Sequence, residues 1–233
     1  MRLYLGTSGF AYKEWVGPFY PAGLPEKELL AWYASQLDTV EINNTFYRFP
    51  TPASLAPWAA QVPEAFRFSF KAPQRITHRQ RLREVDDDVA RLIDALSTLG
   101  PRLGAILFQL PPRMPLNIEA LHDLVTCFPP GLRAAFEFRD LRWHCAEVYT
   151  LLRNHGCPLC HNDDLNTELV PTTDWGYVRL RREHYTDAEL LHAMNNIAAQ
   201  PWLEAFVYVK HEAPDSPLLA RRLRALATAG PTA

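Results

Sequence analysis

The sequence lacks the features that would assign it to a membrane or to nucleic acid at first sight. Its 24 Lys and Arg residues nearly balance its 26 Asp and Glu residues, for a formal net charge of −2. No whole-protein field therefore attracts an anionic membrane or a nucleic acid. No apolar run approaches the ~20 residues that a membrane span requires, and residues 1–7 lack the long apolar core of a signal peptide. We therefore expect a cytoplasmic protein that does not associate with membranes.

The sequence also lacks the usual spacings of metal and redox sites. Its four cysteines include Cys157-Pro-Leu-Cys160, which His161 follows, so the segment matches both a redox pair and a haem-attachment motif. The pair leads into a strand pattern rather than a helix N-terminus, where the helix dipole would lower a thiol pKa, and no export signal accompanies it. No second Cys-x-x-Cys and no His-Glu-x-x-His is present. We expect reduced, structural thiols and no cofactor.

What the sequence does contain is a regular alternation of strand-like and helix-like segments. The predicted strands span residues 3–7, 39–43, 67–71, 104–109, 133–138, 159–162, 177–180 and 206–210. The predicted helices span residues 26–36, 54–61, 85–99, 118–127, 146–154, 187–199 and 217–227. This alternation, in a chain close to the ~250 residues typical of the class, predicts an α/β fold of the TIM (β/α)8-barrel type. An open doubly wound sheet is the rival, but no Gly-x-Gly-x-x-Gly follows a strand and no Walker-type phosphate loop is present.

The barrel is expected to be a single domain. The chain is 48% apolar, enough for a substantial core, and no low-complexity segment or break in composition suggests a linker. The predicted domain spans residues 1–228, and residues 229–233 are predicted to fray. Between residues 163 and 174 the helical periodicity is weak, so we expect the sixth helix to be irregular.

Strand alternation sorts the side chains between the two faces of such a barrel. If Val, Ile, Leu and Phe face outward toward the helices, the inward-facing set is polar nearly all the way round. That set is Tyr4, Gly6, Ser8, Glu41, Asn43, Ser69, Lys71, Gln109, Glu137, Arg139, Tyr177, Arg179, Tyr208 and Lys210. Its polar members lie near the carboxyl ends of their strands, where TIM barrels build active sites.

Residues 134–140, Ala-Ala-Phe-Glu-Phe-Arg-Asp, are the clearest example of inward-facing charged side chains on a strand that otherwise reads as buried. Phe136 and Phe138 point one way, so Glu137 and Arg139 point the other. Burying unpaired charges costs several kcal/mol each, and so many charges are hard to justify by stability alone. A barrel mouth in which the charges pair only with one another is the alternative. The excess of cations over carboxylates leaves room for an anionic ligand.

The loops after the first three predicted strands add aromatic and basic side chains to the same rim. Trp15, Phe46 and Tyr47 are expected to wall a substrate, although packing of the loops under themselves is the alternative. Residues 71–83 form the one basic stretch, which suits a phosphate backbone or a small phosphate, with a solvated loop as the alternative. His78 within it is a candidate proton donor.

A divalent metal is a minority alternative. The ligand types for one are supplied by Glu41, Glu137, His161, Asp163, Asp164 and His211. No metal-site spacing supports it, and carboxylates beside Lys71, Arg139 and Lys210 are more simply explained as ion-paired.

Several short segments together resemble a known family. They are Gly6-Thr-Ser-Gly9 with Trp15 and Phe19-Tyr-Pro21, Glu41-Ile-Asn43 with Thr45-Phe-Tyr-Arg48, Lys71-Ala-Pro73 with Ile76-Thr-His78, Phe108-Gln-Leu-Pro-Pro112, Glu137-Phe-Arg139 with Trp143, and Asp163 or Asp164. On these segments the chain resembles the YecE-like family, the domain of unknown function 72. The resemblance implies a TIM barrel and no established activity. The chain departs from the family pattern at Arg181-Arg182, in place of His-Gly, and at Lys210-His211-Glu212, in place of Phe-Asn-Asn-Asp. These departures leave open whether this member binds a different ligand.

We predict an enzyme that applies general acid and base chemistry to a small, polar, anionic substrate bearing a phosphate or a carboxylate. Glu137 or Glu41 is the expected base, and cations of the rim are expected to bind the anionic group. The predicted catalytic residues are Glu137, Glu41, Lys71, His78 and Asp163. The predicted substrate-binding residues are Ser8, Tyr12, Trp15, Asn43, Phe46, Tyr47, Gln109, Arg139, Trp143, Arg179 and Lys210. A nucleic-acid-binding or processing barrel and a non-catalytic ligand-binding barrel are the alternatives, and the sequence leaves the oligomeric state open.

Overall fold

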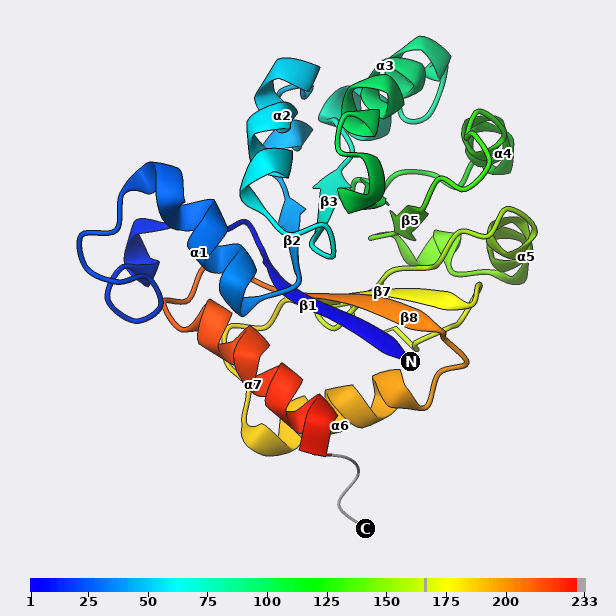
Figure 1. Cartoon of the computed structure of the whole chain (residues 1–233). Coiled ribbons are helices and arrows are strands. Elements are labelled where there is room, and N and C mark those ends of the chain that lie inside the picture. The colour runs from blue at the N-terminus through cyan, green and yellow to red at the C-terminus, as the bar shows by residue number, and fades with distance from the viewer. Residues whose placement is uncertain (166, 230–233) are drawn as a thin grey trace.

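Eight parallel strands form one sheet that curls into a barrel (Figure 1). The structure is a computed structural model that describes residues 1–165 and 167–229. The strands are β1 (Arg2–Ser8), β2 (Thr39–Ile42), β3 (Arg67–Lys71), β4 (Leu103–Gln109), β5 (Ala134–Glu137), β6 (His161–Asn162), β7 (Trp175–Leu180) and β8 (Glu204–Val209). Their order in the sheet is β5-β4-β3-β2-β1-β8-β7-β6. The predicted TIM-type barrel is confirmed.

The barrel closes between β5 and the chain just before β6. The Phe136 N–H donates to the Pro158 carbonyl at 3.0 Å, and the Cys160 N–H donates to the Phe136 carbonyl at 2.7 Å. A parallel bridge between Phe136 and Leu159 accompanies these bonds. Closure leaves the backbone groups at this seam paired, as a barrel requires.

In the part of the chain that the structure describes, seven α-helices lie outside the strands (Figure 1). They are α1 (Leu29–Gln36), α2 (Pro52–Gln61), α3 (Asp86–Ser97), α4 (Ile118–Thr126), α5 (Ala146–Asn154), α6 (Asp187–Ala198) and α7 (Ser216–Ala229). Within the described residues no α-helix connects β6 to β7, which agrees with the irregular connection predicted after β6. Of the predicted tail 229–233, only Ala229 is described, as the last residue of α7; residues 230–233 lie outside the described part.

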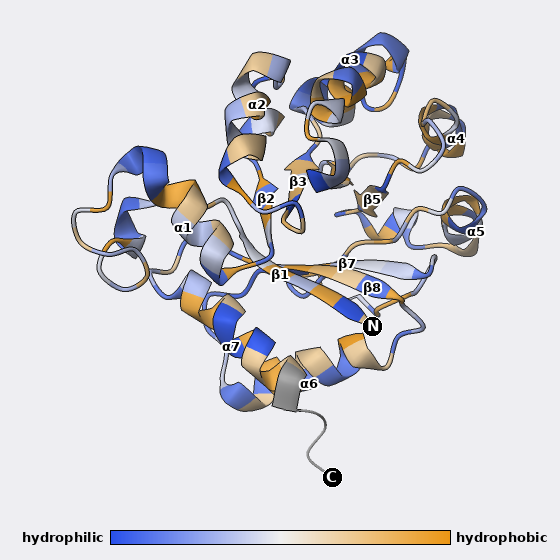
Figure 2. Cartoon of the chain, in the orientation of Figure 1, coloured by the Kyte–Doolittle hydropathy of each residue, from blue (hydrophilic) through white to orange (hydrophobic). Residues whose placement is uncertain are grey.

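Local sequence signals explain where several helices begin. Thr51 and Ser54 form a reciprocal capping box at the start of α2, and Thr186 and Glu189 do the same for α6. Three aspartates occupy the first turn of α3, where the helix dipole favours negative charge. Figure 2 shows α3 with apolar residues along one side and polar residues along the other, as expected for a helix that covers a barrel.

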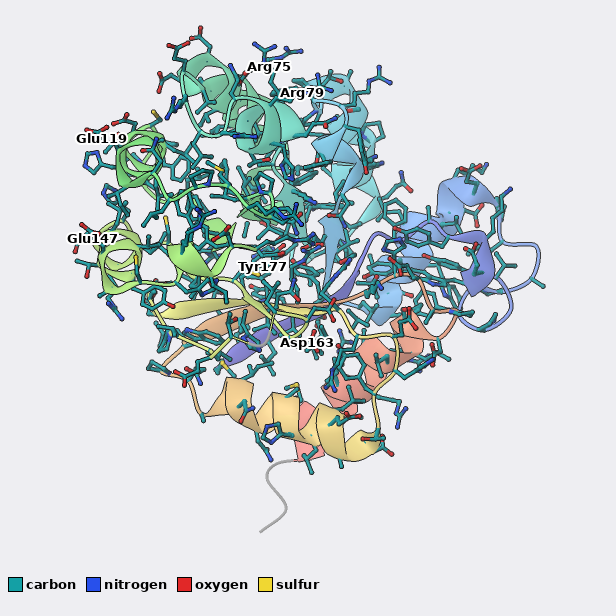
Figure 3. The ribbon with its side chains drawn as sticks, turned by 180° about the vertical axis from the view of Figure 1, so that it is seen from behind. Arg75, Arg79, Glu119, Glu147, Asp163 and Tyr177 are labelled. Atoms are coloured by element: carbon teal, nitrogen blue, oxygen red, sulfur yellow. The ribbon has the colours of Figure 1, made fainter. Side chains whose placement is uncertain are left out.

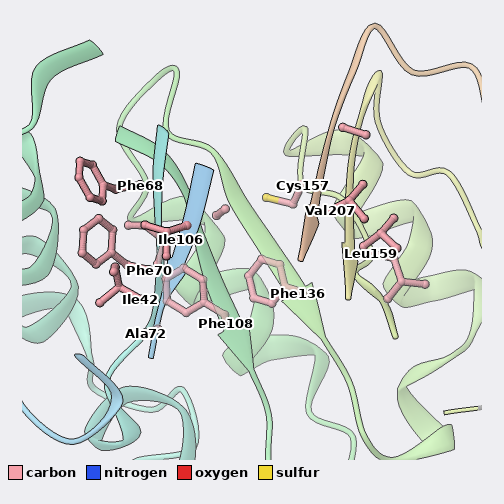
Figure 4. Close-up of a cluster of buried hydrophobic side chains, with 14 of the residues drawn as sticks. Ile42, Phe68, Phe70, Ala72, Ile106, Phe108, Phe136, Cys157, Leu159 and Val207 are labelled. Carbon is pink, nitrogen blue, oxygen red and sulfur yellow. The ribbon is translucent and has the colours of Figure 1, made fainter. Parts of the chain in front are cut away.

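The apolar residues form two separate cores. The larger one lies between the strands and the helices and includes Ile42, Phe70, Phe108 and Phe136 (Figure 4). The smaller one fills the inside of the barrel and contains Tyr4, Ala105, Leu107, Ala135, Cys160, Trp175, Tyr177, Phe206 and Tyr208.

Two of these interior residues correct the sequence analysis. Leu107 and Phe206 face the barrel axis, whereas we had expected every Leu and Phe of the strands to face the helices. Phe206 stacks on Tyr4 with ring centroids 4.7 Å apart, and both rings are buried. Much of the interior is therefore aromatic and apolar, with the buried hydroxyls of Thr39, Ser69 and Tyr208 bonded to one another, and the charged side chains lie near the carboxyl ends of the strands.

Candidate functional site

The centre of the polar end of the barrel is a buried arginine held between two buried glutamates. Arg179 on β7 donates from Nη1 to Glu137 Oε2 at 2.6 Å and from Nη2 to Glu41 Oε1 at 2.9 Å. The Arg179 side chain is 2% exposed, and both glutamate side chains are fully buried. Because removing Arg179 would leave two uncompensated carboxylates in the interior, the two glutamates depend on it, and the three residues behave as a unit.

Further donors saturate each carboxylate. Glu41 accepts from Ser8 Oγ at 2.8 Å, Asn43 Nδ2 at 3.2 Å and Tyr177 OH at 2.8 Å.

The second carboxylate has an equivalent set of donors. Glu137 accepts from Gln109 Nε2 at 2.7 Å, Asn162 Nδ2 at 3.1 Å and Arg139 Nε at 3.1 Å. Each glutamate thus receives four hydrogen bonds once Arg179 is counted, so few lone pairs face the solvent.

The donors and acceptors come from the ends of most of the strands. In chain order they are Ser8 of β1, Glu41 of β2, Gln109 of β4, Glu137 of β5, Asn162 of β6, and Tyr177 and Arg179 of β7. Parallel strands bring their carboxyl ends to one rim, which is why residues so distant in sequence meet here.

The two carboxylates are ionised throughout the neutral range. Burial alone would raise the pKa of each, but Arg179 and the hydrogen bonds outweigh it. The pKa of Glu137 falls to about 2, and that of Glu41 lies below its usual range. Burial acts to lower the pKa of Arg179, but the two glutamates raise it well above its usual range. This group is a fixed, charged floor rather than a set of freely titrating side chains.

Lys71, the last residue of β3, lies above this floor without a hydrogen bond or ion pair among the described residues. Its Nζ lies 4.1 Å from the centroid of the Phe46 ring. Burial, followed by repulsion from Arg179, lowers the pKa of Lys71 to about 8, and attraction by the two glutamates offsets only part of the shift. Lys71 is therefore an amine that loses its proton near physiological pH.

His78 contacts the same aromatic ring. The His78 and Phe46 rings meet edge to face with centroids 4.8 Å apart, and His78 Nδ1 lies 2.9 Å from Thr77 Oγ1. Burial, with repulsion from Lys71 and Arg139, lowers the pKa of His78 to about 4. The imidazole is neutral at pH 7.

A strained stretch of backbone carries His78. Residues Arg75–Arg79 form a single π-helical turn, a feature frequent at functional sites. Arg81, Leu82 and Glu84 then adopt positive φ angles of 51°, 68° and 51°. Each such residue costs on the order of 1 kcal/mol or more, so the surrounding structure must hold this loop in place.

Arg139 and Arg181 supply the cations at the edge of the site. Arg139 bonds Glu137 through Nε only; within the described chain its terminal nitrogens have no partner, and its side chain is 38% exposed. Arg181 donates from Nη1 to Ser8 Oγ at 3.2 Å. Sequence reasoning left Arg181 and Asn162 out of the predicted site. The alternation that turned Arg179 inward could have found Arg181, since it lies two residues further along the chain.

Several predicted site residues lie away from the charged floor. Trp15 is buried and donates from Nε1 to the Ala213 carbonyl at 3.2 Å. Trp143 is buried, donates to the Met114 carbonyl at 2.9 Å and stacks on Phe138. Both indoles therefore pack the loops.

Of the remaining predicted residues, Tyr47 is 77% exposed at the periphery of the rim. Tyr12 lies beside the charged group, because its OH donates to the Ser8 carbonyl at 3.0 Å, and its ring stacks on His211 with centroids 4.5 Å apart. Lys210 Nζ pairs with Glu212 at 2.7 Å.

Asp163 binds the loop that follows β7. Its Oδ1 accepts from the Arg181 N–H at 2.6 Å, and its Oδ2 accepts from Tyr185 OH at 2.5 Å. Asp163 therefore holds a rim loop and makes no contact with Glu41 or Glu137.

Figure 3 shows Tyr177 toward the middle of the barrel, and Arg75 and Arg79 at the outer edge beside α3.

Two cavities border the rim. One of about 320 Å³ lies between the loops after β7 and β8 and is lined by Arg182, Tyr185, Lys210 and Glu212 among others. The other, of about 480 Å³, lies beside α6 and is lined by Leu169, Val178, Leu180 and Ile197 among others. The second lies where a helix between β6 and β7 would pack in a regular barrel.

The described residues, 1–165 and 167–229, hold no group of three His, Cys, Asp or Glu side chains arranged so as to bind a metal ion. No helix among these residues is long and apolar enough to cross a membrane. The four cysteines are free, and burial raises the pKa of Cys157 to about 12, so this thiol stays protonated.

Comparison with known proteins gives a family but no activity. A family model described as "Protein of unknown function DUF72" matches residues 4–232. The chain is 32% identical over 188 residues to the UPF0759 protein YecE of Escherichia coli K12, covering 80% of this chain and 65% of YecE. It is 29% identical over 155 residues to the UPF0759 protein YunF of Bacillus subtilis 168, covering 63% of this chain and 54% of YunF. The chain thus spans less than two thirds of the length of these relatives.

Solved structures agree on the fold. A DUF72 family protein of Thermotoga maritima matches with a TM-score of 0.84 and 25% identity, over 98% of this chain and 100% of that one. A DUF72 family protein of Enterococcus faecalis matches with a TM-score of 0.80 and 19% identity, over 97% of this chain and 95% of that one.

Proposed function

Because the chain belongs to the DUF72 family, whose description assigns no activity, we propose from the site itself that it is an enzyme using general acid and base chemistry on a small anionic substrate. The substrate carries a carboxylate or a phosphate and binds at the carboxyl rim of the barrel. The observation that carries the proposal is Lys71, an amine without a polar partner in the described chain, next to Arg139 and above the Glu41–Arg179–Glu137 floor.

The hydrogen bonds favour Lys71 over the glutamates as the group that moves a proton. A carboxylate with a pKa near 2 and four donors is a weak base at neutral pH. An amine with a pKa of about 8 is protonated in roughly three quarters of molecules at pH 7.5, so it can both accept and donate a proton. In this assignment Glu41 and Glu137 hold Arg179 in place and set the field at Lys71.

The anion is proposed to bind between the free end of Arg139 and Arg181. Both guanidinium groups are anchored by one hydrogen bond each, to Glu137 and Ser8, which pre-organises them. Two further polar atoms, Asn43 Oδ1 and Arg179 Nε, are buried without a hydrogen-bond partner among the described residues. Buried polar atoms are normally paired, so these two atoms also suit a site that a polar ligand completes.

Small anions test this proposal directly. A panel of short carboxylates and phosphate esters, screened by thermal shift at low ionic strength, should include compounds that stabilise the protein. Arg139→Gln should weaken their binding roughly tenfold or more, because it removes a charge-assisted contact. Arg153→Gln on the exposed face of α5 is the matched control and should bind as the unchanged protein does.

The same screen distinguishes an enzyme from a non-catalytic barrel that only binds its ligand. A ligand found in it should react, and Lys71→Met should abolish the reaction while keeping most of the binding. Equal binding by the Arg139 and Arg153 variants would contradict the proposed site.

Nucleic-acid binding is a second candidate, favoured by the loop after β3. Arg79, Arg81 and Arg83 are exposed and form no ion pair among the described residues, whereas Arg75 pairs with Asp88 at 2.6 Å. Such a loop would contact phosphates, so binding to a single-stranded oligonucleotide should fall steeply as salt increases. Absent binding, or binding that the triple substitution of these arginines by glutamine leaves intact, would exclude this candidate.

A further inference from the structure

The chain contains only four lysines, and Lys71 differs from the other three in its surroundings. Lys13 and Lys27 are exposed, and Lys210 forms an ion pair with Glu212. Lys71 ends a barrel strand inside the site, and no carboxylate lies within ion-pair distance of its Nζ among the described residues. Of the two lysines that are partly buried, Lys71 and Lys210, only Lys71 offers a substrate its amine without first breaking an ion pair.

The groups around this amine suit attack on a carbonyl carbon. The Phe46 ring covers Nζ on one side at 4.1 Å, and burial of the amine, with repulsion from Arg179, disfavours its protonated form relative to open water. Glu41 and Glu137 are occupied by their own donors and do not compete for the amine. A lysine that is partly desolvated and next to other cations is the usual form of an activated amine nucleophile.

We propose that Lys71 forms an imine with a substrate that carries a carbonyl group next to an anionic group, as a small 2-oxo acid does. This inference rests on the proposed function and names its substrate class. The carbonyl carbon would lie at Nζ, and the neighbouring carboxylate would reach the terminal nitrogens of Arg139.

The step balances without an oxidant or a reductant. The lone pair of the neutral amine attacks the carbonyl carbon, and the carbonyl oxygen takes up a proton to give a carbinolamine. The carbinolamine then loses its hydroxyl and the remaining N–H hydrogen as water, which leaves a C=N bond in place of C=O. Once protonated, the imine withdraws electrons from the adjacent carbon and eases loss of a proton there; hydrolysis returns the amine.

His78 is placed to carry protons in this step. Its imidazole contacts the same Phe46 ring as Lys71, and its Nε2 has no hydrogen-bond partner among the described residues. Since the ring is neutral at pH 7 and is a weak base, its role is to relay a proton from the attacking nitrogen to the departing hydroxyl within the step, without holding that proton between steps.

Reductive trapping tests the imine on the intact chain. The protein is incubated at pH 7.5 with glyoxylate and sodium cyanoborohydride, and labelled lysines are counted by peptide mapping, which four lysines make unambiguous. Lys71 should be labelled roughly tenfold faster than Lys13, Lys27 or Lys210, because a larger fraction of its amine is unprotonated at pH 7.5. Lys71→Arg should remove this label, and Lys27→Arg should leave it unchanged.

Acetaldehyde serves as the uncharged comparison. Arg139→Gln should slow labelling of Lys71 by glyoxylate about tenfold and leave labelling by acetaldehyde unchanged. If Lys71 is labelled no faster than Lys27, the imine is overturned, and anion binding that still depends on Arg139 would leave the proposed function standing. If glyoxylate and acetaldehyde respond alike to Arg139→Gln, the anionic substrate class is overturned.

Discussion

Arg179 is the residue on which the polar end of the barrel depends. It is the only cation in direct hydrogen-bond contact with both Glu41 and Glu137 among the described residues, and it is buried between them. A buried ion group of this kind adds little stability compared with apolar residues, but removing one partner leaves a bare charge inside the protein. The group is therefore better explained as a device that holds charges in position than as a source of stability.

Replacing Arg179 tests that explanation. Arg179→Met should lower the free energy of unfolding by roughly 3 to 5 kcal/mol in urea titrations at pH 7.5, because it leaves two buried carboxylates facing each other. Adding Glu41→Gln and Glu137→Gln to the same chain should restore much of the loss. Arg153→Met on α5 is the control and should cost less than about 0.5 kcal/mol. A loss below about 1 kcal/mol for Arg179→Met would contradict the described pairing.

At this scale the sequence predicts strand residues well and loop residues poorly. Alternation along the strands turned Glu41, Lys71, Gln109, Glu137 and Arg179 inward, and the structure brings them together at one rim. Loop residues do not alternate between two faces as strand residues do. The sequence therefore does not distinguish a tryptophan that lines the rim from one that packs beneath its own loop. The burial of Trp15 and Trp143 inside their own loops could not be read from their spacing.

At the scale of elements, β1 approaches β2 so closely that one position accepts no side chain. A Cβ placed on Gly6 would lie 1.9 Å from the Thr39 carbonyl oxygen, which belongs to the neighbouring strand. Gly104 on β4 is less constrained, because its added Cβ would first meet Ser69 Oγ at 2.9 Å. The pairing of β1 with β2 also places Ser8 beside Glu41, so the close approach of these two strands determines part of the geometry of the site.

The two glycines form a matched pair of variants. Gly6→Ala should cost about 3 kcal/mol of unfolding free energy or more, since backbone must move, whereas Gly104→Ala should cost about 1 kcal/mol. Chemical denaturation monitored by tryptophan fluorescence measures both. Equal stability of the two variants would show that β1 and β2 are further apart than described.

Most elements were predictable, and the exceptions have physical reasons. The predicted β3 and α5 agree with the structure at both ends, because Arg67–Lys71 and Ala146–Asn154 carry clear periodicity. The sixth strand shrinks from residues 159–162 to His161–Asn162 because residues 158–160 bond β5 irregularly at the seam of the barrel. The π-helical turn Arg75–Arg79 has no sequence signature, so its extra residue could not be foreseen.

At the scale of the whole molecule, apolar and charged side chains occupy different levels along the barrel axis. Much of the interior is a stack of aromatic and apolar side chains, including Tyr4, Phe206 and Trp175, and the group of Glu41, Arg179 and Glu137 lies at the carboxyl end. The alternation of strands and helices was enough to predict this fold, since few other architectures accommodate eight such repeats. The layering of the interior was not predictable, because a rule that sends every Leu and Phe outward ignores the closed end of a barrel.

This arrangement surrounds the amine of Lys71 with fixed charges and a neutral imidazole. The floor fixes two negative charges and one positive charge, the strained loop after β3 carries the neutral His78, and Lys71 lies between them with its pKa lowered to about 8. Because the folded pKa lies below the ordinary lysine value of 10.5, Lys71 loses its charge as pH rises through about 8. Binding of an anion beside Arg139 should raise the pKa of Lys71, since negative charge favours the protonated form.

The most direct test is therefore the titration of Lys71 in the intact protein. Carbon-detected NMR of lysine labelled at Cε, with four resonances assigned through Lys71→Arg, follows the protonation of its Nζ between pH 6 and pH 12. We predict a midpoint of about 8 for Lys71, moving upward when a bound small carboxylate is present. A midpoint at the ordinary lysine value of 10.5 would contradict the assignment of Lys71 as the proton-transferring amine of this site.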